Sequence, residues 1–207
     1  MSPAEPARAV AKMSAETVAK TIAETRAWVD RAVIGLNLCP FAKAPQVKGL
    51  VRYVVSHATD PAALLADLIT ELERLAESPA ERLETTLLIH PQVLIDFADY
   101  NDFIEVAEDT VVELDLEGVL QVASFHPQYQ FADTDADDVS NATNRSPFPT
   151  LHLIREESLD RAVEAFPEAE TIYETNIATL EQLGAEGWAE LQRACRADAA
   201  GPDAAKG

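Results

Sequence analysis

Apolar residues recur at helical spacing in several stretches of this chain. The clearest stripe runs through residues 15–36 and is made by Val18, Ile22, Val29, Val33 and Leu36. A leucine stripe follows Asp60-Pro61, a pair typical of a helix start because aspartate caps the first turn and proline fits inside it. Helices are therefore expected over residues 15–36, 61–77, 92–114, 159–165, 169–183 and 187–194.

Four shorter apolar runs are typical of strands, at residues 51–57, 85–90, 119–126 and 150–155. The first three alternate with helices, which favours parallel pairing through right-handed crossovers. No helix precedes the fourth run, so an antiparallel orientation stays open for it. The pattern predicts a single α/β domain with a central, mostly parallel four-stranded sheet flanked by helices. The irregular residues 127–149 would form a long loop over its carboxyl edge.

Composition agrees with one globular domain, since 47% of the 207 residues are hydrophobic and 25% are charged. The Ala/Pro-rich residues 1–13 and the tail 197–207 are expected to be disordered, which leaves residues 14–196 as the domain.

A formal net charge of −20 changes the expectation for partners. It argues against nucleic acid or an anionic membrane as a partner, because either surface would repel the chain. No secretory signal and no run of about 18 apolar residues is present. Two cysteines, Cys39 and Cys195, make no disulfide framework, so a reducing cytoplasm is the expected compartment.

Histidines are the first candidates for chemistry. His57, His90 and His126 each end a predicted strand, about one strand-plus-helix unit apart. Parallel strands would bring their carboxyl ends to one edge, where open α/β sheets bind ligands. An antiparallel fourth strand would bring His152 to His126. Together, His90, His126 and His152 could hold a divalent transition metal or move protons without one. His57 is a weaker candidate, because its strand need not neighbour the other three.

Acidic residues are missing from two windows, residues 31–59 and 139–155. In so acidic a chain these windows are local positive islands. The second contains Asn144, Arg145 and Ser146, which together suit a carboxylate or phosphate, so we expect a small anionic substrate.

Three further residues have open interpretations. Cys39 is either a buried inert thiol, a nucleophile paired with a histidine, or a metal ligand, and simple topology places it away from the histidine edge. Asp133 belongs either to a solvated acidic turn or to the histidine cluster. Tyr129 either packs the loop or exchanges a proton near His126.

Several motifs resemble the family known as domain of unknown function 1415. They are AVIGLNLCPFAK at residues 32–43, LLIHP at 87–91, DYNDF at 99–103, QVASFHP at 121–127, YQFAD at 129–133, NRSP at 144–147 and LHL at 151–153. The resemblance covers roughly residues 25–184 and implies a soluble bacterial-type protein, but no mechanism. It marks as family pattern Cys39, His90, His126, Asp133, Asn144, Arg145 and His152.

The leading hypothesis is a small-molecule enzyme acting on an anionic substrate at a histidine-lined site. One alternative is a cysteine enzyme using Cys39 with a histidine. Another is a non-catalytic module that binds a metabolite, a partner protein or, with less support, haem.

Overall fold

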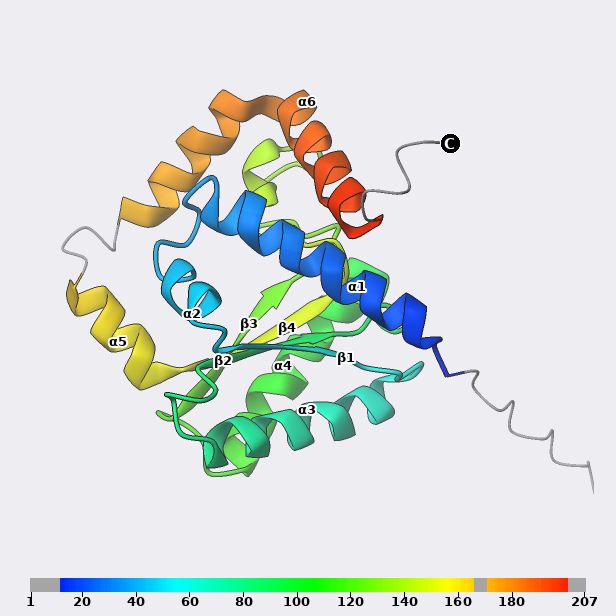
Figure 1. Cartoon of the computed structure of the whole chain (residues 1–207), viewed down its shortest axis with the longest axis vertical. Coiled ribbons are helices and arrows are strands. Elements are labelled where there is room, and N and C mark those ends of the chain that lie inside the picture. Colours follow the sequence, from blue (N-terminus) through cyan, green and yellow to red (C-terminus); the bar gives the residue numbers. More distant parts are fainter. Residues whose placement is uncertain (1–11, 166–170, 201–207) are drawn as a thin grey trace, which may run out of the picture.

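The computed structural model describes residues 12–165 and 171–200. A four-stranded sheet crosses the molecule between two helical layers (Figure 1). Its strands are β1 (Val51–Val55), β2 (Thr85–Ile89), β3 (Leu120–Phe125) and β4 (Thr150–Arg155), in the order β1-β2-β4-β3. The α/β class is confirmed, but the sheet is mixed rather than mostly parallel. Only β1 and β2 pair in parallel, because β4 inserts between β2 and β3 and is antiparallel to both.

Helices α3 (Pro61–Glu77) and α4 (Phe97–Glu113) cover one face of the sheet (Figure 1). Asp60 caps α3 as expected, since its carboxylate accepts a hydrogen bond from the Ala63 amide at 2.9 Å. Helix α4 begins later than predicted because Asp96 caps it by accepting from the Ala98 amide. Four leucines of α3 are completely buried and form the core of this layer with Tyr100 of α4.

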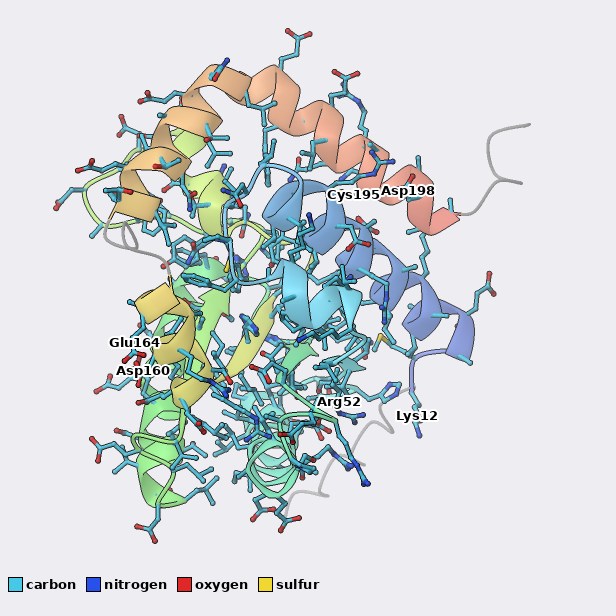
Figure 2. The ribbon with its side chains drawn as sticks, turned by 60° about the vertical axis from the view of Figure 1, so that its left-hand side comes forward. Lys12, Arg52, Asp160, Glu164, Cys195 and Asp198 are labelled. Carbon is cyan, nitrogen blue, oxygen red and sulfur yellow. The ribbon has the colours of Figure 1, made fainter. Side chains whose placement is uncertain are left out.

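The opposite face carries α1 (Ala15–Trp28), η1 (Val29–Ile34), the short α2 (Lys43–Val47), α5 (Glu156–Ala165) and α6 (Ile172–Ala200). The predicted first helix is one continuous helical stretch, but its last part, η1, is a π-helix. Helix α6 joins two predicted helices across a kink at Gly184, whose φ is +70°. Asp160 and Glu164 lie on the outer side of α5 (Figure 2).

The ends of the domain differ from the expectation. Residues 197–200, predicted as disordered tail, are the last turn of α6, where Asp198 pairs with Arg31 at 2.6 Å. Figure 2 shows Asp198 on this turn, just beyond Cys195. The predicted disorder at residues 1–11 and 201–207, and the start of the helix expected from residue 169, lie outside the described residues.

The segment 127–149 is less irregular than expected. It contains the 3₁₀ helix η2 (Val139–Asn144), which packs against α6. The Asn141 side chain ties the segment together, because its oxygen accepts from the Phe131 amide and its nitrogen donates to the Asp135 carbonyl. Among the helices of the described residues, none is long and apolar enough to cross a membrane.

Candidate functional site

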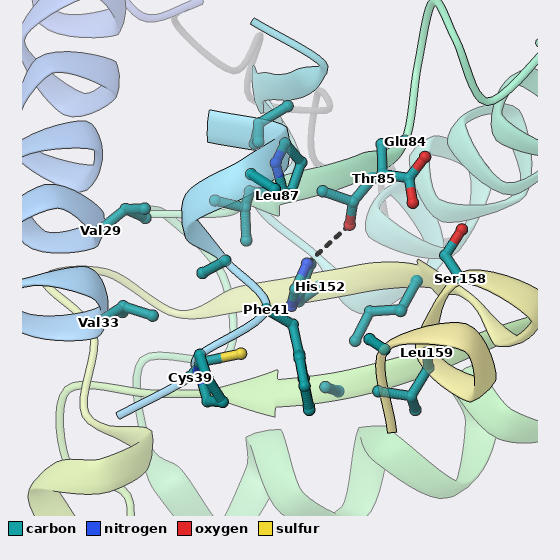
Figure 3. A pocket seen from close by; sticks show the side chains of 18 of the residues that line it. Val29, Val33, Cys39, Phe41, Glu84, Thr85, Leu87, His152, Ser158 and Leu159 are labelled. Atoms are coloured by element: carbon teal, nitrogen blue, oxygen red, sulfur yellow. Dashed lines mark hydrogen bonds between the residues drawn. The ribbon is translucent and has the colours of Figure 1, made fainter. Parts of the chain in front are cut away.

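A cavity of about 630 Å³ lies between the sheet and the layer made by η1, the segment after it, and α5 (Figure 3). Its walls are mainly apolar, with Val29, Val33, Phe41, Leu87, Phe125 and Leu159 among them. Polar side chains interrupt these walls: Cys39, Thr85 and His152 lie among the apolar residues, and Glu84, Ser158 and Arg161 also belong to the lining. The cavity extends from the starts of β1 and β2 over the middle of the sheet to Phe125 at the end of β3, so it covers one face of the sheet rather than only the predicted carboxyl edge.

The segment that carries Cys39 follows from the way η1 ends. A π-helix places more residues in each turn than an α-helix, and such turns are frequent at functional sites. Gly35 closes η1 where no larger residue fits, because a Cβ there would stand 2.2 Å from the Arg31 carbonyl oxygen. The buried Asn176 side chain then donates to the Leu38 carbonyl at 2.9 Å. Helix α6 thereby holds the residue before Cys39 in place.

His152 has a defined tautomer. The Thr85 hydroxyl donates its only proton to the Leu153 carbonyl at 2.6 Å, so it can only accept from His152 Nε2, 2.7 Å away. Nε2 therefore carries the proton and Nδ1 keeps a free lone pair. Figure 3 shows that ring edge on the side of Cys39 and Phe41. Burial lowers the pKa of His152 to about 4, so the ring is a neutral proton acceptor at pH 7.

Cys39 is a half-buried thiol whose sulfur points into the cavity (Figure 3). Burial raises its pKa, and the backbone N–H groups of Phe41 and Ala42 oppose that rise because they stabilise the thiolate. At neutral pH the sulfur keeps its proton, and a base is needed to form the nucleophile. The imidazole of His152 is the neutral base that lines the same cavity.

A second cavity of about 310 Å³ adjoins the first. Ala44, Pro45, Glu84 and Arg161 line both cavities. Its remaining lining includes Lys48 and Glu81, so this end is charged whereas the first cavity is mainly apolar.

His90 and His126 lie on the other side of the sheet, packed around Tyr100 of α4. Their rings are 5.7 Å and 5.0 Å from the Tyr100 ring, and both residues are 0% exposed. Burial lowers the pKa of His90 to about 4 and also lowers that of His126. Nδ1 of His90 bonds the Val93 carbonyl, whereas its Nε2 has no partner among the described residues.

The expected three-histidine metal site is therefore wrong. β4 turns Leu151 and Leu153 into the α3–α4 core, so His152, between them, faces the opposite layer from His90 and His126. In the described part of the chain, no group of three His, Cys, Asp or Glu side chains is placed to hold a metal ion.

The predicted anion clamp bonds the protein's own backbone. Arg145 donates to the carbonyls of Tyr129 and Ala136, Asn144 donates to that of Ser124, and the Ser146 hydroxyl donates to that of Phe148. These bonds hold the segment 127–149 on the end of β3, and none of the three side chains lines the cavity. Their role in binding an anion stays a prediction.

Tyr129 and Asp133 also stand apart from the cavity. The Tyr129 ring packs on Phe97 and Phe131, at 5.2 Å and 5.0 Å, close to the His126 side of the sheet. Asp133 is exposed in a left-handed turn, with φ of +63°. The structure thus places both in the loop, as the packing and solvated-turn interpretations expect.

Sequence reasoning missed Thr85, the residue that orients His152. A threonine in a buried strand is ordinary, and its partner lies on a strand distant in sequence. The available signal was the alternation Leu151-His152-Leu153, which indicates that this histidine and its leucine neighbours occupy opposite faces.

Comparison with known proteins gives one match. The model of a family described as a protein of unknown function (DUF1415) matches residues 20–190. No curated protein and no solved structure matches the chain.

Proposed function

The chain belongs to the DUF1415 family of proteins of unknown function, and we propose that this member is an enzyme acting on a small molecule whose apolar body fills the cavity above the sheet. In this proposal Cys39 is the nucleophile, His152 the proton acceptor and Thr85 a positioning residue. One observation carries it: the Cys39 sulfur and the free Nδ1 of His152 belong to the same cavity.

The shape and lining of the cavity support a small molecule as the substrate. A volume of about 630 Å³ falls within the range of ligand pockets, which combine apolar walls with a few placed polar groups. Apolar side chains from both the sheet and η1 would enclose an aliphatic or aromatic group. The anionic substrate expected from the sequence would then need its charge at the cavity's polar end.

The proposed step is acyl transfer to the thiol. Cys39 Sγ attacks a carbonyl carbon while its proton passes to His152 Nδ1, directly or through one water. The S–C bond forms, the bond to the leaving oxygen breaks, and the imidazolium returns the proton to that oxygen. Thr85 accepts from Nε2–H throughout and so keeps the second nitrogen free to work as a base.

A thioester burst tests this proposal. The probe is p-nitrophenyl octanoate, an activated ester with an apolar chain, and the background is Cys195→Ser, so that Cys39 is the one thiol. We expect a burst of p-nitrophenol and an octanoyl adduct on Cys39 by mass spectrometry. Cys39→Ala should abolish both, and His152→Asn should slow the burst by about a hundredfold, the lower end for a general base. His57→Asn, the matched control, should leave it unchanged.

An equal burst in Cys39→Ala, or none in the parent protein, would contradict the enzyme. The raised pKa of Cys39 favours a second candidate, a non-catalytic binding protein in which the thiol is only part of the wall. That candidate predicts binding of octanoate, measured by calorimetry, with no thioester on Cys39.

A further inference from the structure

The two adjoining cavities differ in the chemistry of their walls. Cys39 and His152 belong to the apolar cavity, whereas Lys48 and Glu81 belong to the smaller one. Glu84 and Arg161 line both, so they stand where the cavities meet. Figure 3 shows Glu84 on the side of the apolar cavity opposite Cys39. A ligand reaching from the thiol through the apolar cavity would therefore place its far end among charged side chains.

These charges are balanced, which is unusual for this chain. The whole protein has 36 acidic and 16 basic side chains, yet the smaller cavity has two of each. Lys48 directly follows α2, Glu81 and Glu84 come just before β2, and Arg161 lies on α5. Arg161 is held only loosely, by the Ser158 hydroxyl at 3.1 Å and by Glu157 at 3.9 Å, so its guanidinium can still bind a ligand.

We propose that the substrate is amphipathic and zwitterionic: its apolar body fills the larger cavity, and a head with both an ammonium and an acid group binds in the smaller one. The inference rests on the proposed function for the body of the ligand and adds the chemistry of the head. Glu84 would accept from the ammonium group and Arg161 would donate to the acid group. A head of one sign would meet two side chains of like charge, which disfavours it.

Four compounds with the same ten-carbon chain test this proposal: decanol, decanoate, decylamine and α-aminodecanoate. Their dissociation constants are measured by calorimetry below their micelle concentrations, with Trp28 fluorescence, from the cavity wall, as a second readout. We expect α-aminodecanoate to bind about tenfold more tightly than decanoate or decylamine, since only this compound satisfies both signs of charge.

Charge-removing variants then assign each half of the head. Glu84→Gln should weaken the binding of α-aminodecanoate and decylamine. The affinity for decanoate should stay unchanged or rise slightly. Arg161→Gln should weaken the binding of α-aminodecanoate and decanoate, but not that of decylamine. Glu77→Gln and Arg82→Gln are the matched controls, because both side chains are exposed and line neither cavity, and they should change nothing.

The outcomes separate this inference from the function on which it rests. If all four compounds bind within about twofold of one another, the zwitterionic head is wrong and the apolar cavity stands. If decanoate or decylamine binds best, the head carries one charge and the inference is overturned. If none of the four binds, both the inference and the proposed function fail.

Discussion

Replacing Thr85 with valine removes the hydroxyl that orients His152 and leaves the shape of the side chain nearly unchanged. Two hydrogen bonds are lost, to His152 Nε2 at 2.7 Å and to the Leu153 carbonyl at 2.6 Å. Each contributes about 1 kcal/mol net, and a buried Nε2–H left without a partner adds about 1–2 kcal/mol. We therefore expect Thr85→Val to lower the free energy of unfolding by about 3–4 kcal/mol.

The neighbouring residue offers a matched control. Thr86 is 0% exposed, points to the other face of β2, and has a hydroxyl with no hydrogen-bond partner among the described residues. Thr86→Val removes an unpaired buried polar group, so it should be neutral or stabilising by about 1 kcal/mol. Urea unfolding measures both variants, with the m-value as a check that only stability changes. Nitrogen chemical shifts of His152 report which ring nitrogen carries the proton. Thr85→Val should allow a mixture of the two tautomers, because the hydroxyl that holds the proton on Nε2 is gone. Equal effects of the two variants on stability would refute the proposed bonding of His152.

Three further predictions concern the rest of the fold. The pKa of His90 is about 4 in the folded protein and about 6.5 in the unfolded chain, which therefore takes up the proton first as the pH falls. Burial of His90 should lower stability by about 3 kcal/mol as the pH falls from about 6.5 towards 4, and His152, whose pKa is also about 4, should add a drop of similar size. His90→Gln should reduce that drop in urea titrations. Arg155→Met should lower the free energy of unfolding, measured by thermal unfolding, by about 2–4 kcal/mol, because Arg155 donates to three carbonyls at and after the end of α3. Arg82→Met, at an exposed position, is the control and should change that free energy little. Gly35→Ala should destabilise by more than about 1 kcal/mol in the same assay, since its Cβ would meet the Arg31 carbonyl; an unchanged midpoint would contradict that clash.

Local signals in the sequence predicted most elements closely. The capping of α3 by Asp60 and the bounds of β4 are as expected, because each depends on residues adjacent in the chain. The end of the first helix was harder. Apolar spacing marks a helix face over several turns, but it does not show the single wider turn by which η1 departs from an α-helix.

The order and faces of the strands could not be read in the same way. β1, β2 and β3 do point in one direction, so their carboxyl ends share an edge, yet β4 lies between β2 and β3. In β2 every residue is buried, so no alternation of polar and apolar residues shows which face each side chain takes. A shift of one residue moves a side chain to the opposite face. His90 and His152 were therefore grouped by their place along the strands, although they face opposite layers.

The relation of Cys39 to a histidine was also hidden by topology. Simple topology placed Cys39 near the start of β1, away from the expected histidine edge, and so separated it from a histidine, whereas the structure brings it into a cavity that His152 also lines. The antiparallel β4 removes that separation, because it brings His152 opposite Leu87, the middle residue of β2, on the face that the cavity covers. The pairing of β2 with the distant β4 brings these residues together, and no local motif in the sequence indicates that pairing.

The most direct test of the account is a crystal structure of the Cys195→Ser protein alkylated with N-octyl iodoacetamide. The account predicts a single adduct on Cys39, with the octyl chain inside the cavity against Val29 and Phe125 and its amide near His152. An octyl chain directed into solvent, with the cavity still empty, would contradict the claim that Cys39 opens onto a binding site.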